Sequence, residues 1–350
     1  MPISIKNIHT MPVTQASRRL TLKLAAASLA TPATFACAMQ STLTAAPSNV
    51  VKAVASFAAL EPATTNCLVE VASAGQNWRA AHQPNRQLFV GSAVKTFILA
   101  QFLRDVETAR QGLTASQAAT ISDAVRSPGS PVFLGLTGKT PYRSVLEAMI
   151  THSDNTATDI ALAKAEPARV RALIAEAGLQ QTRIPDSTRK LFSYLSGAKP
   201  GVDLGWEGME RLANGETLGL TARTSVINDE QTMLSSATDM VHWYRQSLGG
   251  KFFQKPATLT EYKRIQAMAD AIARTVPPGI AAFGKGGSID WEGFHCLCFP
   301  GQMVVGNTTA TFCFTLNWTG DVHSDQRADA FLAAASQVLA EVTKAVRPRA

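Results

Sequence analysis

Ser92-Ala93-Val94-Lys95, in a chain of 350 residues, indicates a particular fold when it is taken with two strings that follow it. These strings are Ser153-Asp154-Asn155 and Lys285-Gly286-Gly287-Ser288. Each is weak alone, because a serine before a helix, a polar helix junction and a glycine-rich turn occur in many proteins without any chemistry. In this order they describe one acyl-transfer site with a serine nucleophile, a base and a second cation.

Ser92 and Lys95 stand three residues apart at the start of a helical pattern that Gly112 ends. The apolar residues of that pattern are Val94, Phe97, Ile98, Phe102 and Val106. The spacing predicts a helix over 93–110 with Ser92 as its first residue or N-cap. Ser92 and Lys95 would then share one helix face, where Lys95 could take the proton of Ser92. Taken alone, the same pair fits a helix cap beside a solvated lysine.

A lysine acts as a base near neutral pH only where burial or a second positive charge lowers its pKa. Lys285 is the natural second cation, and it follows a strand-like run that begins at residue 281. The glycines after it, including Gly287, would let a substrate approach closely, although they would suit a turn equally well.

Ser153-Asp154-Asn155 lies between helical patterns over 142–151 and 156–164. By itself it predicts a helix junction. Beside Ser92, the Ser153 hydroxyl would relay a proton, the Asn155 amide would hold a substrate carboxamide, and Asp154 would be structural.

The three strings, with their order and flanks, resemble the class A β-lactamase and penicillin-binding family. The resemblance covers the chain from about residue 51 and includes a first strand at 67–73, the end of the Ω loop at 228–232 and a helix at 236–248. It implies that Ser92 is the acylated nucleophile and Lys95 its base.

The resemblance also implies roles for the other two strings. Ser153 and Asn155 would form the second wall, and Lys285 would attract a substrate carboxylate. The main-chain N–H groups of Ser92 and Ser288 would form an oxyanion hole, whose donors are often the largest catalytic contribution.

The sequence departs from this family in the residue that would release the acyl group. The family carries an Ω-loop glutamate in an R-x-E-x-x-L-N pattern, which is absent before Asn228. The corresponding segment is long, with its excess at 180–224, and it offers Glu207 and Glu216 as candidate bases. Asp159 stands where the family has an asparagine that bonds the glutamate, so two carboxylates would repel each other there. The sequence thus leaves Glu207, Glu216 or no residue as the base.

The composition predicts a globular, enzyme-sized protein, with 46% hydrophobic and 17% charged residues. No apolar run reaches the roughly 18 residues of a membrane span. Arg18-Arg19 before an alanine-rich apolar run and a small-residue site at 35–38 resemble a twin-arginine signal over 1–38. We expect a periplasmic or secreted protein with one hydrolase domain over 51–350.

The net charge of +7 arises mainly from this N-terminal segment. Residues 1–38 hold four basic residues and no acidic one, so 33 − 4 = 29 basic residues face 26 acidic ones in the remainder, a charge of +3. No concentrated basic stripe suggests a nucleic-acid partner. We expect a monomer that acts on a small molecule and needs no cofactor.

Four cysteines would remain after loss of Cys37, namely Cys67, Cys296, Cys298 and Cys313. Cys296 and Cys298 lie two residues apart on one strand and share one of its faces. A zinc site would need more closely spaced pairs of ligands, so no metal site is predicted. A disulfide such as Cys67 with Cys313 and buried free thiols both remain open.

Strand-like runs lie near both ends of the chain, and the middle is mainly helical. The runs cover 67–73, 76–81, 281–286, 294–300 and 310–318, and a terminal helix covers 325–346. The predicted fold is therefore α/β with two lobes, an antiparallel sheet from both chain ends and an all-helical lobe over about 96–276, with the site in the cleft between them.

The leading functional prediction is an exported serine hydrolase that opens β-lactams. A carboxypeptidase, esterase or transacylase with the same nucleophile is an alternative, as is a penicillin-binding module that stays acylated. The lack of an attached signalling segment argues against a sensor.

Overall fold

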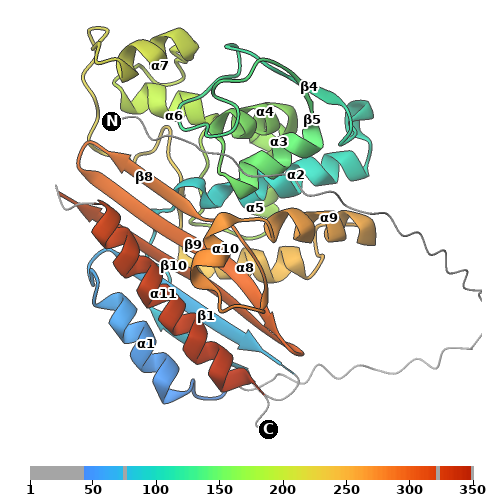
Figure 1. Cartoon of the computed structure of the whole chain (residues 1–350), viewed down its shortest axis with the longest axis vertical. Coiled ribbons are helices and arrows are strands. Elements are labelled where there is room, and N and C mark those ends of the chain that lie inside the picture. The colour runs from blue at the N-terminus through green and yellow to red at the C-terminus, as the bar shows by residue number, and fades with distance from the viewer. Residues whose placement is uncertain (1–42, 74–76, 321–323, 348–350) are drawn as a thin grey trace, which may run out of the picture. The chain divides into compact units, whose positions relative to one another are not determined.

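A central antiparallel sheet combines strands from both chain ends in a computed structural model that describes residues 43–73, 77–320 and 324–347 (Figure 1). Its strands are β1 (Thr65–Ala72), β2 (Asn77–His82), β7 (Ala281–Gly284), β8 (Gly287–Trp291), β9 (Phe294–Val305) and β10 (Thr308–Thr319). The order is β2-β1-β10-β9-β7, and β8 also pairs with β9. The predicted α/β fold is confirmed.

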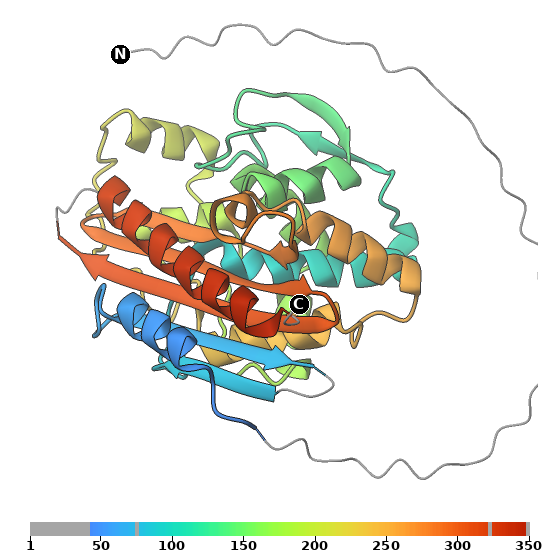
Figure 2. The same cartoon turned by 60° about the horizontal axis from the view of Figure 1, so that its bottom comes forward.

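Two terminal helices cover one face of this sheet, as Figure 2 shows. They are α1 (Ser48–Ala58) and α11 (Ser324–Val346). Val50, Val54 and Phe57 recur at helical spacing on α1 and are buried. The Phe57 ring centre lies 5.2 Å from that of Phe314 of the sheet and 5.6 Å from that of Phe331 of α11, so Phe57 links both helices to the sheet.

Helices of the middle of the chain cover the other face, whereas α10 (Asp270–Thr275) lies beside α11. The helices before α10 are α2 (Lys95–Glu107), α3 (Tyr142–Thr151), α4 (Asn155–Ala165), α5 (Pro167–Glu176), α6 (Thr188–Leu195), α7 (Gly205–Ala213), α8 (Ala237–Leu248) and α9 (Pro256–Gln266), with 3-10 turns η1 (Gly91–Val94) and η2 (Arg110–Gly112). Trp243 of α8 packs against Phe97 of α2 with ring centres 4.7 Å apart. This contact ties the helix that follows Ser92 to the core.

The middle of the chain is not wholly helical. Two short pairs of strands interrupt it: β3 (Leu88–Phe89) with β6 (Leu234–Ser235), and β4 (Ala118–Ile121) with β5 (Gly138–Pro141). Strands of two to four residues carry too little alternation to be distinguished from loops in the sequence. The first pair joins the segment before Ser92 to the segment before α8.

The strand predicted over 281–286 ends at Gly284, and a separate strand, β8, begins at Gly287 after Lys285 and Gly286. Gly284 pairs with Gly301 and Gly287 with Cys298, so both strands keep one register on β9.

The four described cysteines are free and buried. Cys67 lies opposite Phe314, whereas Cys313 lies opposite Leu68. Neighbouring residues of a strand face opposite sides of a sheet, so Cys67 and Cys313 point away from each other and cannot pair.

Two further predictions concern an N-terminal export signal and the absence of a membrane-spanning helix. The export signal expected over 1–38 lies outside the described residues. Within the described part of the chain, no helix is long and apolar enough to cross a membrane.

Candidate active site

Ser92 lies in the 3-10 turn η1 and not at the α-helix cap that the sequence predicts. The N-cap residue of α2 is Val94, and no side chain caps the helix there. The Ser92 hydroxyl is therefore not used to hold the helix start. Gly91 before it has φ +53°, in the left-handed region that favours glycine, and turns the chain into η1.

Strand β8 runs so close to η1 that neither backbone has room for a side chain. A Cβ at Gly287 would overlap the Val90 carbonyl oxygen and lie 3.0 Å from the Ser92 nitrogen. A Cβ at Gly91 would lie 2.9 Å from the Ser288 nitrogen. The two glycines thus bring the main-chain nitrogens of Ser92 and Ser288 to one place.

Lys95 is fully buried and directs its ammonium group at the junction between α3 and α4. Its Nζ donates to the Ser153 carbonyl oxygen at 2.6 Å and to Asn155 Oδ1 at 2.7 Å, and it lies 3.3 Å from Ser153 Oγ. Burial, and secondly the charge of Lys285, lower the pKa of Lys95 well below its ordinary value. A lysine in this state can accept a proton near neutral pH.

The junction that meets Lys95 is a tight, strained turn. Ser153 has φ +58°, a conformation that costs a residue with a side chain about 1–2 kcal/mol. Buried Asp154 offsets this cost by capping α4: its carboxylate accepts N–H bonds from Ala157 at 2.7 Å, Val132 at 2.9 Å and Phe133 at 2.8 Å. The expectation that Asp154 is structural agrees with these bonds.

A loop that the sequence analysis did not single out orients Asn155. The Asn155 Nδ2 donates to the Pro128 carbonyl oxygen at 2.7 Å, which leaves Oδ1 to face Lys95. Gly129 has φ +74°, and a Cβ there would lie 2.8 Å from Asn155 Nδ2. The sequence Ser127-Pro128-Gly129-Ser130 predicts a turn, but nothing in it indicates that this turn contacts Asn155.

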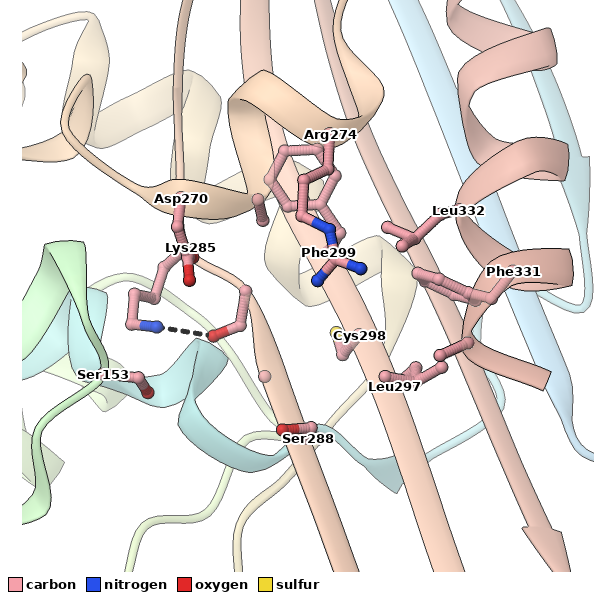
Figure 3. A pocket seen from close by; sticks show the side chains of 14 residues that line it. Ser153, Asp270, Arg274, Lys285, Ser288, Leu297, Cys298, Phe299, Phe331 and Leu332 are labelled. Atoms are coloured by element: carbon pink, nitrogen blue, oxygen red, sulfur yellow. Dashed lines mark hydrogen bonds between the residues drawn. The ribbon is translucent and has the colours of Figure 1, made fainter. Parts of the chain in front are cut away.

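Lys285 lines a pocket of about 150 Å³ beside the nucleophile turn (Figure 3). Its Nζ donates to the Gly286 carbonyl oxygen at 2.7 Å. Burial lowers the pKa of Lys285 to about 8. Arg274 and Asp270 of α10 line the same pocket, with Phe331 and Leu332 among the residues of its apolar wall. The pocket thus offers two cations and one carboxylate near Ser288.

The model of the beta-lactamase enzyme family matches residues 48–342. The chain belongs to the beta-lactamase enzyme family. The resemblance drawn from the three strings is thereby confirmed. No curated protein matches the chain.

Several solved structures share the fold of this beta-lactamase-family chain. A beta-lactamase from Sphaerobacter thermophilus DSM 20745 is 18% identical with a TM-score of 0.62, over 86% of this chain and 98% of that one. PBP-A is 15% identical with a TM-score of 0.62, over 87% and 100% of the two chains. The chromosome-encoded beta-lactamase of Vibrio parahaemolyticus is 17% identical with a TM-score of 0.63, over 83% and 99%.

The two glutamates considered for deacylation lie away from this beta-lactamase-family site. Glu207 is exposed on α7, and Glu216 forms an ion pair with Arg211 at 2.7 Å. Neither lines the Lys285 pocket, and in the described ranges no hydrogen bond joins either one to Lys95.

Asp159 bonds to the start of α6, a contact that the sequence analysis missed. Its Oδ1 accepts from the Thr188 nitrogen at 2.6 Å and the Thr188 hydroxyl at 2.8 Å, and its Oδ2 accepts from the Arg189 nitrogen at 3.0 Å. Among the residues that the structure describes, no glutamate bonds to this carboxylate. Ser187 before a short helical pattern could have predicted the start of this helix. The sequence could not have predicted its contact with Asp159, which is 29 residues away from Thr188.

Proposed function

We propose that this protein is a serine hydrolase that opens β-lactams through an acyl-enzyme on Ser92. The observation that carries the proposal is the fully buried Lys95, which lies three residues after Ser92 and contacts Ser153 and Asn155. A buried lysine with a lowered pKa is an unusual feature that suits a general base.

Acylation follows from these positions. Neutral Lys95 takes the proton of the Ser92 hydroxyl while Ser92 Oγ attacks the lactam carbonyl carbon. The N–H groups of Ser92 and Ser288 stabilise the developing oxyanion. The ring C–N bond then breaks, and the Ser153 hydroxyl, 3.3 Å from Lys95 Nζ, passes the proton to the leaving nitrogen.

The charges of the Lys285 pocket support a substrate with a carboxylate beside its reactive carbonyl. Lys285 and Arg274 both line this pocket, and no ion pair involves either side chain in the described part of the chain. Their two positive charges exceed the single negative charge of Asp270. A penicillin carries such a carboxylate.

Time-resolved intact mass of the purified mature protein mixed with a simple penicillin tests the proposal. We expect an adduct of the penicillin mass that forms on Ser92 and is later released. Ser92→Ala should form no adduct, whereas Ser225→Ala, at an exposed serine just after the long segment, should behave like the parent. An unchanged adduct in Ser92→Ala would reject the nucleophile.

A second candidate is a carboxypeptidase, esterase or transacylase with the same nucleophile. The exposure of Glu207 and the ion pair of Glu216 favour it, because neither supplies a base for water at the acyl group. Slow release of the penicilloyl group together with fast cleavage of a D-alanyl peptide or a simple ester would identify this activity.

A further inference from the structure

Asp159 is a buried carboxylate on α4, one helical turn beyond Asn155. Its charge acts on Lys95, so it belongs electrostatically to the candidate site. Since Asn155 Oδ1 bonds to Lys95 Nζ, the same helix face joins the base to Asp159.

Thr188 lies between Asp159 and the Asn155 backbone. Its hydroxyl donates to Asp159 Oδ1 at 2.8 Å and lies 3.3 Å from the Asn155 carbonyl oxygen. Ser127 Oγ lies 2.9 Å from Thr188 Oγ, a pair in which either hydroxyl can be the donor, and the Ser127 hydroxyl also bonds to the Asp159 carboxylate. The Thr188 side chain is buried, and its hydroxyl oxygen has two acceptor positions, so Thr188 Oγ can accept a proton while its own proton points to Asp159.

The other carboxylates near this region are committed elsewhere. Asp154 is the second carboxylate whose charge raises the pKa of Lys95, but it already accepts three main-chain N–H bonds. In the long segment, Asp186 bonds to Arg171 and Asp203 to Arg189. Among the described carboxylates, Asp159 is thus the one that combines burial, proximity to Lys95 and a hydroxyl partner.

We propose that Thr188 and Asp159 form a proton relay that releases the acyl group from Ser92. This inference rests on the proposed acyl-enzyme. A water molecule attacks the ester carbonyl carbon and gives one proton to Thr188 Oγ, whose own proton moves to Asp159 Oδ1. The tetrahedral intermediate expels Ser92 Oγ, which recovers that proton by the same route. One water is consumed, and a free acid and the Ser92 hydroxyl are produced.

The environment of Asp159 suits a temporary proton acceptor. Burial raises the pKa of Asp159, and the bonds from Thr188 and Arg189 oppose that rise without cancelling it. A threonine hydroxyl alone is too weak a base to activate water, but a carboxylate behind it can take the proton. The relay places the carboxylate on α4 and the hydroxyl on α6.

The test measures acylation and release separately by quenched-flow intact mass of the full chain with a simple penicillin. Asp159→Asn and Thr188→Val remove the acceptor and the hydroxyl, and Thr188→Ser keeps the hydroxyl. The double variant Asp159→Asn/Thr188→Glu moves the carboxylate to α6. Asp203→Asn is the matched control, because it loosens the ion pair to Arg189 on α6 but leaves the relay intact.

We expect Asp159→Asn and Thr188→Val to slow release relative to acylation by about 100-fold, the ordinary contribution of a general base. Thr188→Ser should stay within a few-fold of the parent, and the double variant should recover part of the lost rate. A purely structural role would instead slow acylation and release alike in Asp159→Asn and Thr188→Val, so their ratio would stay at that of the parent. Thermal unfolding confirms that each variant is folded.

Two results would overturn the relay. The relay is rejected if Thr188→Val and Asp159→Asn release the acyl group at the parent rate. It is also rejected if the parent forms an adduct that is never released, and in that case the proposed acylation of Ser92 is still supported. If neither a penicillin nor an activated ester forms an adduct, the proposed function fails, and the relay fails with it.

Discussion

Replacement of Asp154 should destabilise the protein by an amount that depends on how many of its three N–H bonds survive. The carboxylate is fully buried, with Oδ1 accepting from Ala157 and Oδ2 from Val132 and Phe133. A buried amide left without an acceptor costs about 1–3 kcal/mol. At the lower end of that range, Asp154→Ala should cost about 3 kcal/mol of the free energy of unfolding.

Asp154→Asn should cost less, because one carbonyl oxygen remains. If that oxygen faces Val132 and Phe133, only the Ala157 N–H loses its acceptor, at about 1 kcal/mol. Loss of the negative charge at the start of α4 adds about 0.5 kcal/mol. Both variants lose this charge, so they should differ by about 2 kcal/mol, which is the cost of the two additional N–H groups that Asp154→Ala leaves without an acceptor.

Urea unfolding followed by circular dichroism measures these differences. Asp229→Ala is the control, because the Asp229 side chain is 92% exposed and its ion pair with Arg183 should not affect the unfolding midpoint. Equal midpoints for Asp154→Ala and the parent, or a larger loss for Asp154→Asn than for Asp154→Ala, would refute the assignment of Asp154 as the cap of this junction.

Three further predictions concern activity. The kcat/KM for a penicillin should rise with pH as Lys95 loses its proton, because only the neutral amine can accept one, and it should fall above about pH 8 as Lys285 loses the positive charge that attracts the carboxylate. A flat profile of kcat/KM between pH 5 and 9 would contradict this prediction. Gly287→Ala should slow acylation by about 100-fold in stopped-flow measurements, because the added Cβ would force β8 away from η1 and displace the Ser288 N–H. An acylation rate equal to that of the parent would reject the close approach of β8 to η1. Arg274→Ala should raise KM for a penicillin several-fold but leave KM for a neutral ester unchanged; equal effects on both substrates would exclude a role in carboxylate recognition.

Much of the fold is predictable because its signals are local. The helix over 142–151 has the predicted bounds, and Ser236 caps the helix that begins one residue later. Alternation and apolar runs identify strands at both chain ends, although β9 and β10 each extend to 12 residues. These signals depend on near neighbours in the chain, which the sequence displays directly.

The geometry of the site depends on distant contacts that no local pattern records. Ser92 sits in a 3-10 turn because the glycine backbone of β8, almost 200 residues later in the chain, packs against it. The burial of Lys95 requires the α3–α4 junction, and the orientation of Asn155 requires the Pro128 carbonyl oxygen. None of these partners could be paired from spacing alone.

The choice of the residue that releases the acyl group likewise depends partly on local sequence and partly on distant contacts. The family, the order of the elements and the residues that could carry the chemistry follow from the sequence alone, because motifs and helical periodicity are local properties of the chain. The exposure of Glu207 and the bond between Asp159 and Thr188 are evident only in the folded protein. The physical reason is that burial, close backbone approach and the pKa of a lysine depend on which distant segments pack together, and that packing is a property of the whole folded chain.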